Sequence, residues 1–257
     1  MAGLVERRDR VGSLTKGLGV IEILAAEPSG LSLSQVAHRT GLTRAGARRL
    51  LLTLVDSGWA HQDGRTFTLS PRPLTIARSW LNSQSIWNFA LGPMRELSAL
   101  LRESCSAGVL SGEDIVYVAR VPGERITSVA LHVGTRLPAY CTAMGRVLLA
   151  GLGSSERASL LDRMKLEKRT PKSVSDRAGL EAVIDRAADD GYALIDEELE
   201  LGLRSIAVPL RDRLGRTVAA VNISTPSARH SVSEMESAIL PELRKAATRI
   251  EEWFVLD

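Results

Sequence analysis

The spacing of apolar residues changes along the chain and predicts two kinds of structure. Between residues 14 and 56, apolar positions recur at helical spacing in three short segments, separated by Pro28-Ser29-Gly30 and by Gly41. Residues 59–69 are predicted instead as two short strands joined at Asp63-Gly64, a dipeptide typical of hairpin turns. Three helices followed by a hairpin predict a winged helix-turn-helix.

The third predicted helix, Arg44 to Asp56, has an apolar face and a basic face. At about 100° per residue, its leucines cluster on one side and its arginines occupy an arc near the helix start. A helix that enters a major groove amino end first brings such residues to base edges and phosphates, while a hairpin arginine reaches the backbone or minor groove. The candidate DNA-contacting residues are Thr43, Arg44, Ala45, Arg48, Arg49 and Arg65. The alternative is a small helical domain whose arginines are only solvated.

A domain boundary is predicted at Ser70-Pro71-Arg72-Pro73, so we expect the DNA-binding domain to comprise residues 1–72. Two further helices, over 74–83 and 86–102, are predicted to form a helical linker and dimerisation segment, residues 73–102. Apolar aromatic residues on this segment need cover, either from a second subunit or from the chain's own second domain. These residues are Trp80, Trp87 and Phe89.

Residues 103–257 are predicted as an α+β effector-binding domain, in which helices cover an antiparallel sheet. Strand-like alternation comes first, followed by helical spacing, a hairpin and a long closing helix. The expected strands cover 105–110, 114–121, 127–133, 205–211 and 217–224, with a further strand starting at Gly191. The expected helices cover 142–150, 154–164, 176–189 and 231–254.

The net charge of +3 over 257 residues is unevenly distributed. Residues 1–72 hold ten basic and six acidic residues, a charge of +4, which leaves −1 for the rest of the chain. A basic amino-terminal module on a near-neutral larger one favours a polyanion-binding domain fused to another domain. The longest apolar runs are far shorter than the roughly 20 residues of a membrane helix. The first ten residues do not resemble a secretory signal, so we expect a cytoplasmic protein with no membrane partner.

Candidate catalytic chemistry is scarce. The four histidines are scattered, the two cysteines are too few for a cysteine-rich zinc site, and no phosphate loop or dinucleotide fingerprint occurs. We therefore expect neither an enzyme nor a bound cofactor or metal. The alternative is a thiolate pair of Cys141 and His132, although a lone cysteine is more often a buried hydrophobic residue.

Several motifs identify a family. The chain resembles the IclR family of bacterial transcriptional regulators over nearly its whole length, above all at Gly134-Thr135-Arg136-Leu137-Pro138 and from Gly202 to Pro209. The stretches Glu103-Ser104-Cys105-Ser106, Tyr117-Val118-Ala119-Arg120 and Pro138-Ala139-Tyr140-Cys141-Thr142 resemble the β-ketoadipate branch, whose members respond to protocatechuate or 4-hydroxybenzoate. The resemblance implies a winged-helix domain, a helical linker and a GAF-like effector domain, assembled as homodimers or dimers of dimers.

The resemblance also implies a pocket for a small carboxylate effector. The implied effector-binding residues are Ile126, Val129, Leu137, Ala143, Met144, Asp196, Ser205, Asn222 and Ser224. The backbone N–H groups of Ala143 and Met144, which open a helix, would hold the carboxylate. Ser205, Asn222 and Ser224 would add side-chain donors, and the last two share a strand face because they are two residues apart. The three aliphatic residues would form the apolar wall.

Two departures from the family pattern bear on the choice of ligand. Ser205 stands where many members have cysteine, and Ile195 stands where several have aspartate, with Asp196 next to it. These residues favour an aromatic acid over a polar ligand such as glyoxylate.

The sequence therefore predicts a ligand-responsive DNA-binding transcriptional regulator that controls aromatic-acid catabolism genes. Its expected partners are a double-stranded DNA operator with paired half-sites and a hydroxybenzoate or related aromatic-pathway metabolite. The alternative is a small-molecule-binding signalling module that acts through protein partners without specific DNA binding. Phosphate-dominated DNA binding weakens steeply with salt, which separates the two.

Overall fold

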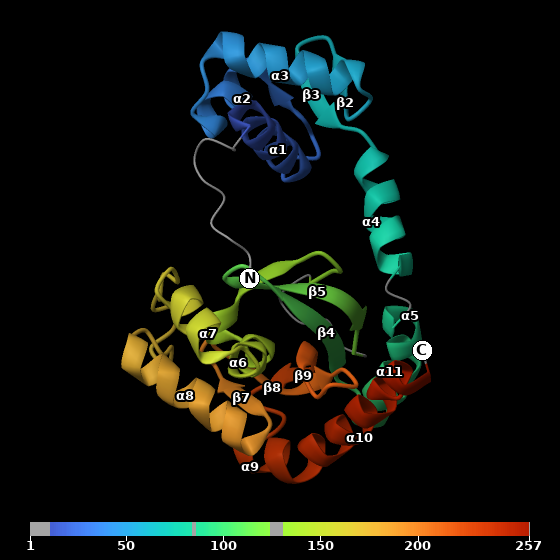
Figure 1. Ribbon diagram of the computed structural model, residues 1–257, viewed down its shortest axis with the longest axis vertical. Coiled ribbons are helices and arrows are strands. Elements are labelled where there is room, and N and C mark those ends of the chain that lie inside the picture. The colour runs from blue at the N-terminus through green and yellow to red at the C-terminus, as the bar shows by residue number, and fades with distance from the viewer. Residues whose placement is uncertain (1–10, 84–85, 124–130, 257) are drawn as a thin grey trace. The chain divides into compact units, whose positions relative to one another are not determined.

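The computed structural model describes residues 11–83, 86–123 and 131–256, and the chain divides into two compact units, Met1–Ser83 and Gln84–Asp257 (Figure 1). Each unit has its own cluster of buried apolar side chains. No helix in the described part of the chain is long and apolar enough to cross a membrane.

The first unit contains the predicted three helices and hairpin. Its elements are α1 (Gly12–Ala25), β1 (Leu31–Ser32), α2 (Leu33–Thr40), α3 (Arg44–Asp56), β2 (Ala60–Asp63), β3 (Thr66–Leu69) and α4 (Arg72–Ser83). The strands lie in the order β1-β3-β2, and Leu31 pairs with Phe67. The sequence did not predict β1, because two residues are too few to show a strand period.

Local hydrogen bonds set the ends of α2 and α3. Ser32 and Gln35 form a capping box at the start of α2, and Gly41, with a φ of 65°, ends that helix. The Thr43 hydroxyl accepts from the Gly46 N–H at 3.1 Å and caps α3. These residue types favour such positions, so the short turn between the two helices is encoded locally.

The second unit is built on a six-stranded antiparallel sheet in the order β6-β5-β4-β9-β8-β7. Its strands are β4 (Ser104–Ser111), β5 (Asp114–Val121), β6 (Arg136–Pro138), β7 (Ala193–Asp196), β8 (Leu203–Arg211) and β9 (Thr217–Pro226). Its helices are α5 (Ile86–Leu101), α6 (Ala143–Ala150), α7 (Ser154–Leu161), α8 (Arg177–Asp190), α9 (Val232–Glu234), α10 (Leu240–Glu251) and α11 (Trp253–Leu256).

Helices cover both faces of this sheet. Helix α6 packs on β4, β8 and β9, with α8 behind it, while α10 packs on β8 and α5 on β4 and β5. Buried residues alternate accordingly on β8, where Ala207 belongs to the cluster under α6 and its neighbours Ile206 and Val208 point the other way. The predicted α+β architecture is confirmed.

The segment expected as one linker consists of two helices in different units. Helix α4 belongs to the first unit, whereas α5 packs against β4, β5 and α10 of the second. Trp87 is buried, and the ring of Phe89 lies 5.7 Å from that of Trp253. For these two aromatic residues the cover comes from the chain's own second domain, while the side chain of Trp80 is not among those described.

The strand expected at 127–133 is not observed in its described part, residues 131–133. Residues 127–130 lie outside the described residues. The neighbour of β5 is instead β6, with Leu137 opposite Ile115.

A buried ion pair holds α6 to the segment that follows β7. The Arg146 guanidinium donates to both Glu198 carboxylate oxygens, at 2.8 and 2.6 Å, and to the Tyr140 carbonyl at 3.2 Å. Glu198 also accepts from the Val174 N–H at 3.1 Å. The side chains of the pair are only 4% and 11% exposed, so neither charge can be hydrated if its partner is lost.

We predict that Glu198→Ala lowers the free energy of unfolding of the second unit by about 3–5 kcal/mol, because it leaves the Arg146 charge buried and unpaired. Urea denaturation measures the change. The matched control is Glu242→Ala, which removes an exposed pair with Lys245 and is expected to cost less than about 1 kcal/mol. Equal losses in the two variants would contradict this role of the buried pair.

Candidate functional site

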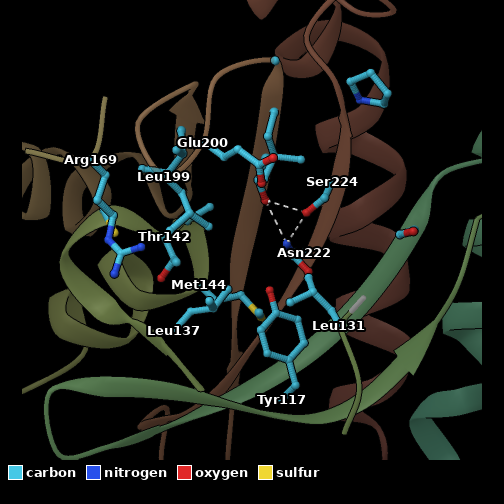
Figure 2. Close-up of a pocket in the computed structure, with 18 of the residues that line it drawn as sticks. Tyr117, Leu131, Leu137, Thr142, Met144, Arg169, Leu199, Glu200, Asn222 and Ser224 are labelled. Atoms are coloured by element: carbon cyan, nitrogen blue, oxygen red, sulfur yellow. Dashed lines mark hydrogen bonds between the residues drawn. The ribbon is translucent and has the colours of Figure 1, made fainter. Parts of the chain in front are cut away.

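A cavity of about 630 Å³ lies in the second unit, between the sheet, the start of α6 and the segment around Leu199–Leu203 (Figure 2). This volume is in the range of small-molecule sites. Its lining comprises Ser104, Tyr117, Arg120, Leu131, Leu137, Cys141, Thr142, Ala143, Met144, Arg169, Ile195, Leu199, Glu200, Leu201, Gly202, Leu203, Ser205, Asn222, Ser224 and Pro226.

Most of the effector-binding residues expected from the sequence meet at this cavity. Those that line it are Leu137, Ala143, Met144, Ser205, Asn222 and Ser224. Ile126 and Val129 lie outside the described residues. They stay candidates for the apolar wall.

Asp196 does not line the cavity, in contrast to the expectation. Its carboxylate accepts from the Arg204 Nε at 2.8 Å and pairs with the Lys172 ammonium at 2.9 Å. Side chains alternate along β7, and because Ile195 faces the cavity, Asp196 points to the other side.

Three polar side chains form a closed hydrogen-bonded network on the sheet. The Asn222 amide donates to Ser205 Oγ at 2.8 Å and to Ser224 Oγ at 2.9 Å (Figure 2). The Ser224 hydroxyl donates to Ser205 Oγ at 3.1 Å, and Ser205 donates to the Ile223 carbonyl at 3.1 Å. Both amide N–H donors of Asn222 are therefore used within the network. The sequence analysis expected this side chain to donate to a ligand instead. Its Oδ1 is buried with no partner among the described residues.

The start of α6 offers backbone donors to the same cavity. The Thr142 hydroxyl caps the helix by accepting from the Gly145 N–H at 3.2 Å. No hydrogen bond between described residues uses the N–H groups of Ala143 and Met144. Gly145 allows this close packing, since a Cβ there would lie 2.1 Å from the Ala139 carbonyl oxygen. These two N–H groups stay candidates for the anion site that the resemblance implies.

A β-bulge brings Arg120 to the cavity. Tyr117 lies opposite Gly108 and Ala119 lies opposite Ala107, so Val118 is an extra residue in β5. Without it, strict alternation would place Tyr117 and Arg120 on opposite faces. With it, both face α6 and line the cavity.

The lining has an excess of positive charge. Its charged side chains among the described residues are Arg120, Arg169 and Glu200, a net charge of +1. Arg120 is half-buried and donates to Ser106 Oγ at 3.2 Å and to Ser104 Oγ at 3.5 Å. Arg169 is exposed. Such a lining favours an anionic ligand over a cationic one.

Sequence reasoning missed Tyr117, Arg120 and Arg169. The bulge hides Arg120, and Arg169 lies in an irregular segment where no period predicts its direction. Burial raises the pKa of Tyr117 to about 12, so its hydroxyl is protonated at neutral pH. An arginine near the end of the apolar run from Ile115 to Ala119 is the signal that could have drawn attention to this strand.

The cysteine alternative has no support in this geometry. The Cys141 thiol contacts the Pro138 carbonyl oxygen at 3.8 Å, and burial raises its pKa to about 11. His132 is exposed and no bond between described residues joins it to Cys141. The described residues also contain no group of three His, Cys, Asp or Glu side chains placed to hold a metal.

The first unit displays the predicted DNA-contacting residues at its surface. Ala47, Leu51 and Leu54 of α3 are buried in the core. The exposed candidates are Thr43, Arg44, Ala45, Arg48, Arg49 and Arg65. The ion pairs between described residues include none of the four arginines in this set. Their charges are therefore available to a polyanion.

Comparison with known proteins identifies the family. Residues 78–252 match the family described as "Bacterial transcriptional regulator IclR C-terminal", and residues 13–64 match the "IclR helix-turn-helix domain". The chain belongs to the IclR family. It is thus a ligand-responsive, DNA-binding transcriptional regulator, as predicted. The helix-turn-helix match disfavours the alternative of a signalling module without DNA binding.

Named IclR-family relatives are similar over nearly the whole chain. The Pca regulon regulatory protein of Pseudomonas putida is 41% identical over 93% of this chain and 82% of its own length. The p-hydroxybenzoate hydroxylase transcriptional activator of Acinetobacter baylyi is 32% identical over 96% of this chain and 93% of its own. The inducer-binding domain of a PobR double mutant from Acinetobacter, solved with 3-hydroxybenzoic acid, is 30% identical with a TM-score of 0.61. It matches 64% of this chain and 97% of its own.

We predict that native Cys141 reacts with iodoacetamide at pH 8 about a hundred times more slowly than an ordinary thiol. A pKa raised from 9.0 to about 11 lowers the reactive thiolate fraction by about that factor. Peptide mass spectrometry over time measures the rate at Cys141, with the urea-unfolded protein as the control. Equal rates in the native and unfolded protein would contradict the buried, protonated thiol.

Proposed function

We propose that the cavity of the second unit binds a small aromatic carboxylate of the hydroxybenzoate class, and that this ligand controls DNA binding by the first unit. The observation that carries the proposal is a cavity with a net positive lining, which contains polar side chains of the sheet and two α6 residues whose N–H groups have no acceptor among the described residues. The relative from Acinetobacter that was solved with 3-hydroxybenzoic acid supports the ligand class.

In this proposal the ligand carboxylate accepts from the N–H groups of Ala143 and Met144. Ser224 is half-buried at the cavity, and its hydroxyl hydrogen can rotate from Ser205 towards the ligand while its oxygen still accepts from Asn222. The ring lies against apolar side chains of the lining. These include Tyr117, Leu131, Leu137 and Met144.

For the first unit we propose that α3 enters the major groove. Arg44 and Arg48 then reach base edges, Arg49 reaches phosphate, and Arg65 contacts the backbone from the hairpin. Thr43 and Ala45 lie at the same helix start. This function places the protein in the cytoplasm, with the chromosome.

One such helix reads only a few base pairs, so we further propose a symmetric homo-oligomer on paired half-sites. Exposed apolar side chains on two helices of the first unit are available for a second copy of the chain. They are Leu14 and Leu18 of α1 and Leu74 and Ile76 of α4.

Coupling between ligand and DNA requires a ligand whose affinity differs between two arrangements of the protein. Strand β5 carries Tyr117 and Arg120 at the cavity, and α5 packs on β5. Because α5 follows α4 in the chain after residues 84–85, a shift of β5 is expected to act on this connection.

We predict that Arg48→Ala weakens binding to a selected operator and relaxes sequence preference by about 1–3 kcal/mol, because it removes a base contact. Arg65→Ala is the matched comparison and is expected to weaken binding to all sequences alike, with the salt slope reduced by about one charge. Fluorescence anisotropy at several salt concentrations measures both, and footprinting shows whether two half-sites are protected. Wild-type sequence preference in Arg48→Ala would place the recognition surface elsewhere.

We predict that Ser224→Ala lowers the affinity for 4-hydroxybenzoate or protocatechuate roughly tenfold to a hundredfold, because a hydrogen bond to a charged group is worth about 1.5–3 kcal/mol. Isothermal titration calorimetry measures the affinity. Ser237→Ala, which changes an exposed serine outside the lining, is the control. Ligand-free DNA binding is expected to persist in both variants. An unchanged affinity in Ser224→Ala would move the binding site away from this network.

A further inference from the structure

Three polar residues to which the proposed function gives no contact with the ligand meet at the cavity, and they come from two of the sequence motifs. Ser104 and Ser106 of β4 belong to one motif, and Arg120 of β5 belongs to the other. Ser106 pairs with Arg120 across one side of β4 and with Asn222 across the other, while Ser104 pairs with Ser224. Cross-strand partners share a face of the sheet, so all these side chains lie under α6.

The guanidinium of Arg120 is held in place by neutral oxygen atoms. It donates to Ser106 Oγ at 3.2 Å and to Ser104 Oγ at 3.5 Å, and Ser104 Oγ also accepts from the Gly123 N–H at 3.0 Å. An arginine has five N–H donors, so these two bonds leave three unspent within the described part of the chain. Arg120 contacts Ser104, and Ser104 pairs with Ser224 across the neighbouring strand. The guanidinium charge therefore lies near Ser224 of the polar network.

Other sequestered arginines of the second unit have a carboxylate partner. Arg146 pairs with Glu198, and Arg204 pairs with Asp196. The ion pairs between described residues include none for Arg120. Burial lowers the pKa of Arg120, and among the described groups only the Tyr117 hydroxyl acts against this shift. A partly buried cation without a counter-ion is unfavourable unless a ligand supplies one.

We propose that Arg120 is the counter-ion of the effector carboxylate and therefore determines the specificity of the site for anions. This inference rests on the proposed function and deepens it, because the α6 N–H groups and the Ser224 hydroxyl are all neutral donors. Neutral donors also bind an amide or an ester. A fixed guanidinium distinguishes a carboxylate from these uncharged analogues, since a charge-assisted pair is stronger than a neutral hydrogen bond.

Arg169 is the competing cation in the lining, and two features set it apart. It is exposed, so water already solvates its charge. It also lies off the sheet, beside Tyr140 and Cys141, where burial raises both pKa values and the charge of Arg169 offsets only part of the increase. We therefore expect Arg169 to contribute less to anion selectivity than Arg120.

The test compares the full-length protein's affinity for 4-hydroxybenzoate with its affinity for 4-hydroxybenzamide, a neutral analogue of nearly the same shape. Calorimetry measures both dissociation constants for the wild type and for Arg120→Met, Arg120→Lys and Arg169→Met. The exposed arginine of β6, in Arg136→Met, is a control outside the lining. The ratio of the two constants reports charge recognition and is insensitive to a general loss of folded protein.

We expect the wild type to prefer the acid by at least about tenfold, and Arg120→Met to reduce this preference roughly tenfold to a hundredfold. Arg120→Lys is expected to retain part of the preference, and Arg136→Met to retain all of it. Circular dichroism confirms that the variants are folded.

Three results would overturn the inference alone while the proposed function stands. They are binding of acid and amide with equal affinity by the wild type, equal losses for both ligands in Arg120→Met, and collapse of the preference in Arg169→Met but not in Arg120→Met. If the wild type binds neither compound, the proposed function and the inference are both overturned.

Discussion

The burial of polar side chains beneath α6 is the constraint on which the second unit depends. A sheet face covered by a helix is ordinarily apolar, but here serine, asparagine and arginine side chains from β4, β5, β8 and β9 lie on it. Buried polar groups destabilise a fold unless they find partners. The network of Ser205, Asn222 and Ser224 meets most of this demand within the sheet. The ligand proposed for the cavity would account for the polar side chains kept there.

The arginines of this unit show how one residue type serves two purposes. Arg146 and Arg204 are neutralised by acidic residues close to the loop after β7, and so they hold the walls of the cavity together. Arg120 is positioned by hydroxyl groups, which fix its direction without cancelling its charge. The first kind of contact stabilises the fold, and the second leaves a charge available to a ligand.

The same strand connects the site to the rest of the molecule. One face of β5 lines the cavity with Tyr117 and Arg120, and α5 packs on this strand and on β4. The proposed ligand would therefore bind next to a strand that also contacts α5, the first helix of the second unit. Shifts of packed helices are one of the known ways in which regulatory proteins change state.

Local chemistry determined the features that the sequence predicted by itself. Ser32, Gly41 and Thr43 set helix ends through contacts within a few residues, and the two-residue spacing of Asn222 and Ser224 put both at the cavity. Motifs along the chain were enough to indicate the family. These properties depend on neighbours in sequence, so reading the sequence recovers them.

Only the tertiary structure decided which side chains the cavity receives. One extra residue, Val118, reverses the direction of the residues after it in β5, and the bulge is defined by pairing with β4. It brought Arg120 into the site, whereas the alternation of β7 turned Asp196 away from it. Trp87 of α5 is buried within its own unit, and this burial also depends on tertiary packing. The directions of these side chains depend on pairing with strands that are distant in sequence. The periodicity of one strand does not indicate its partner or its bulges.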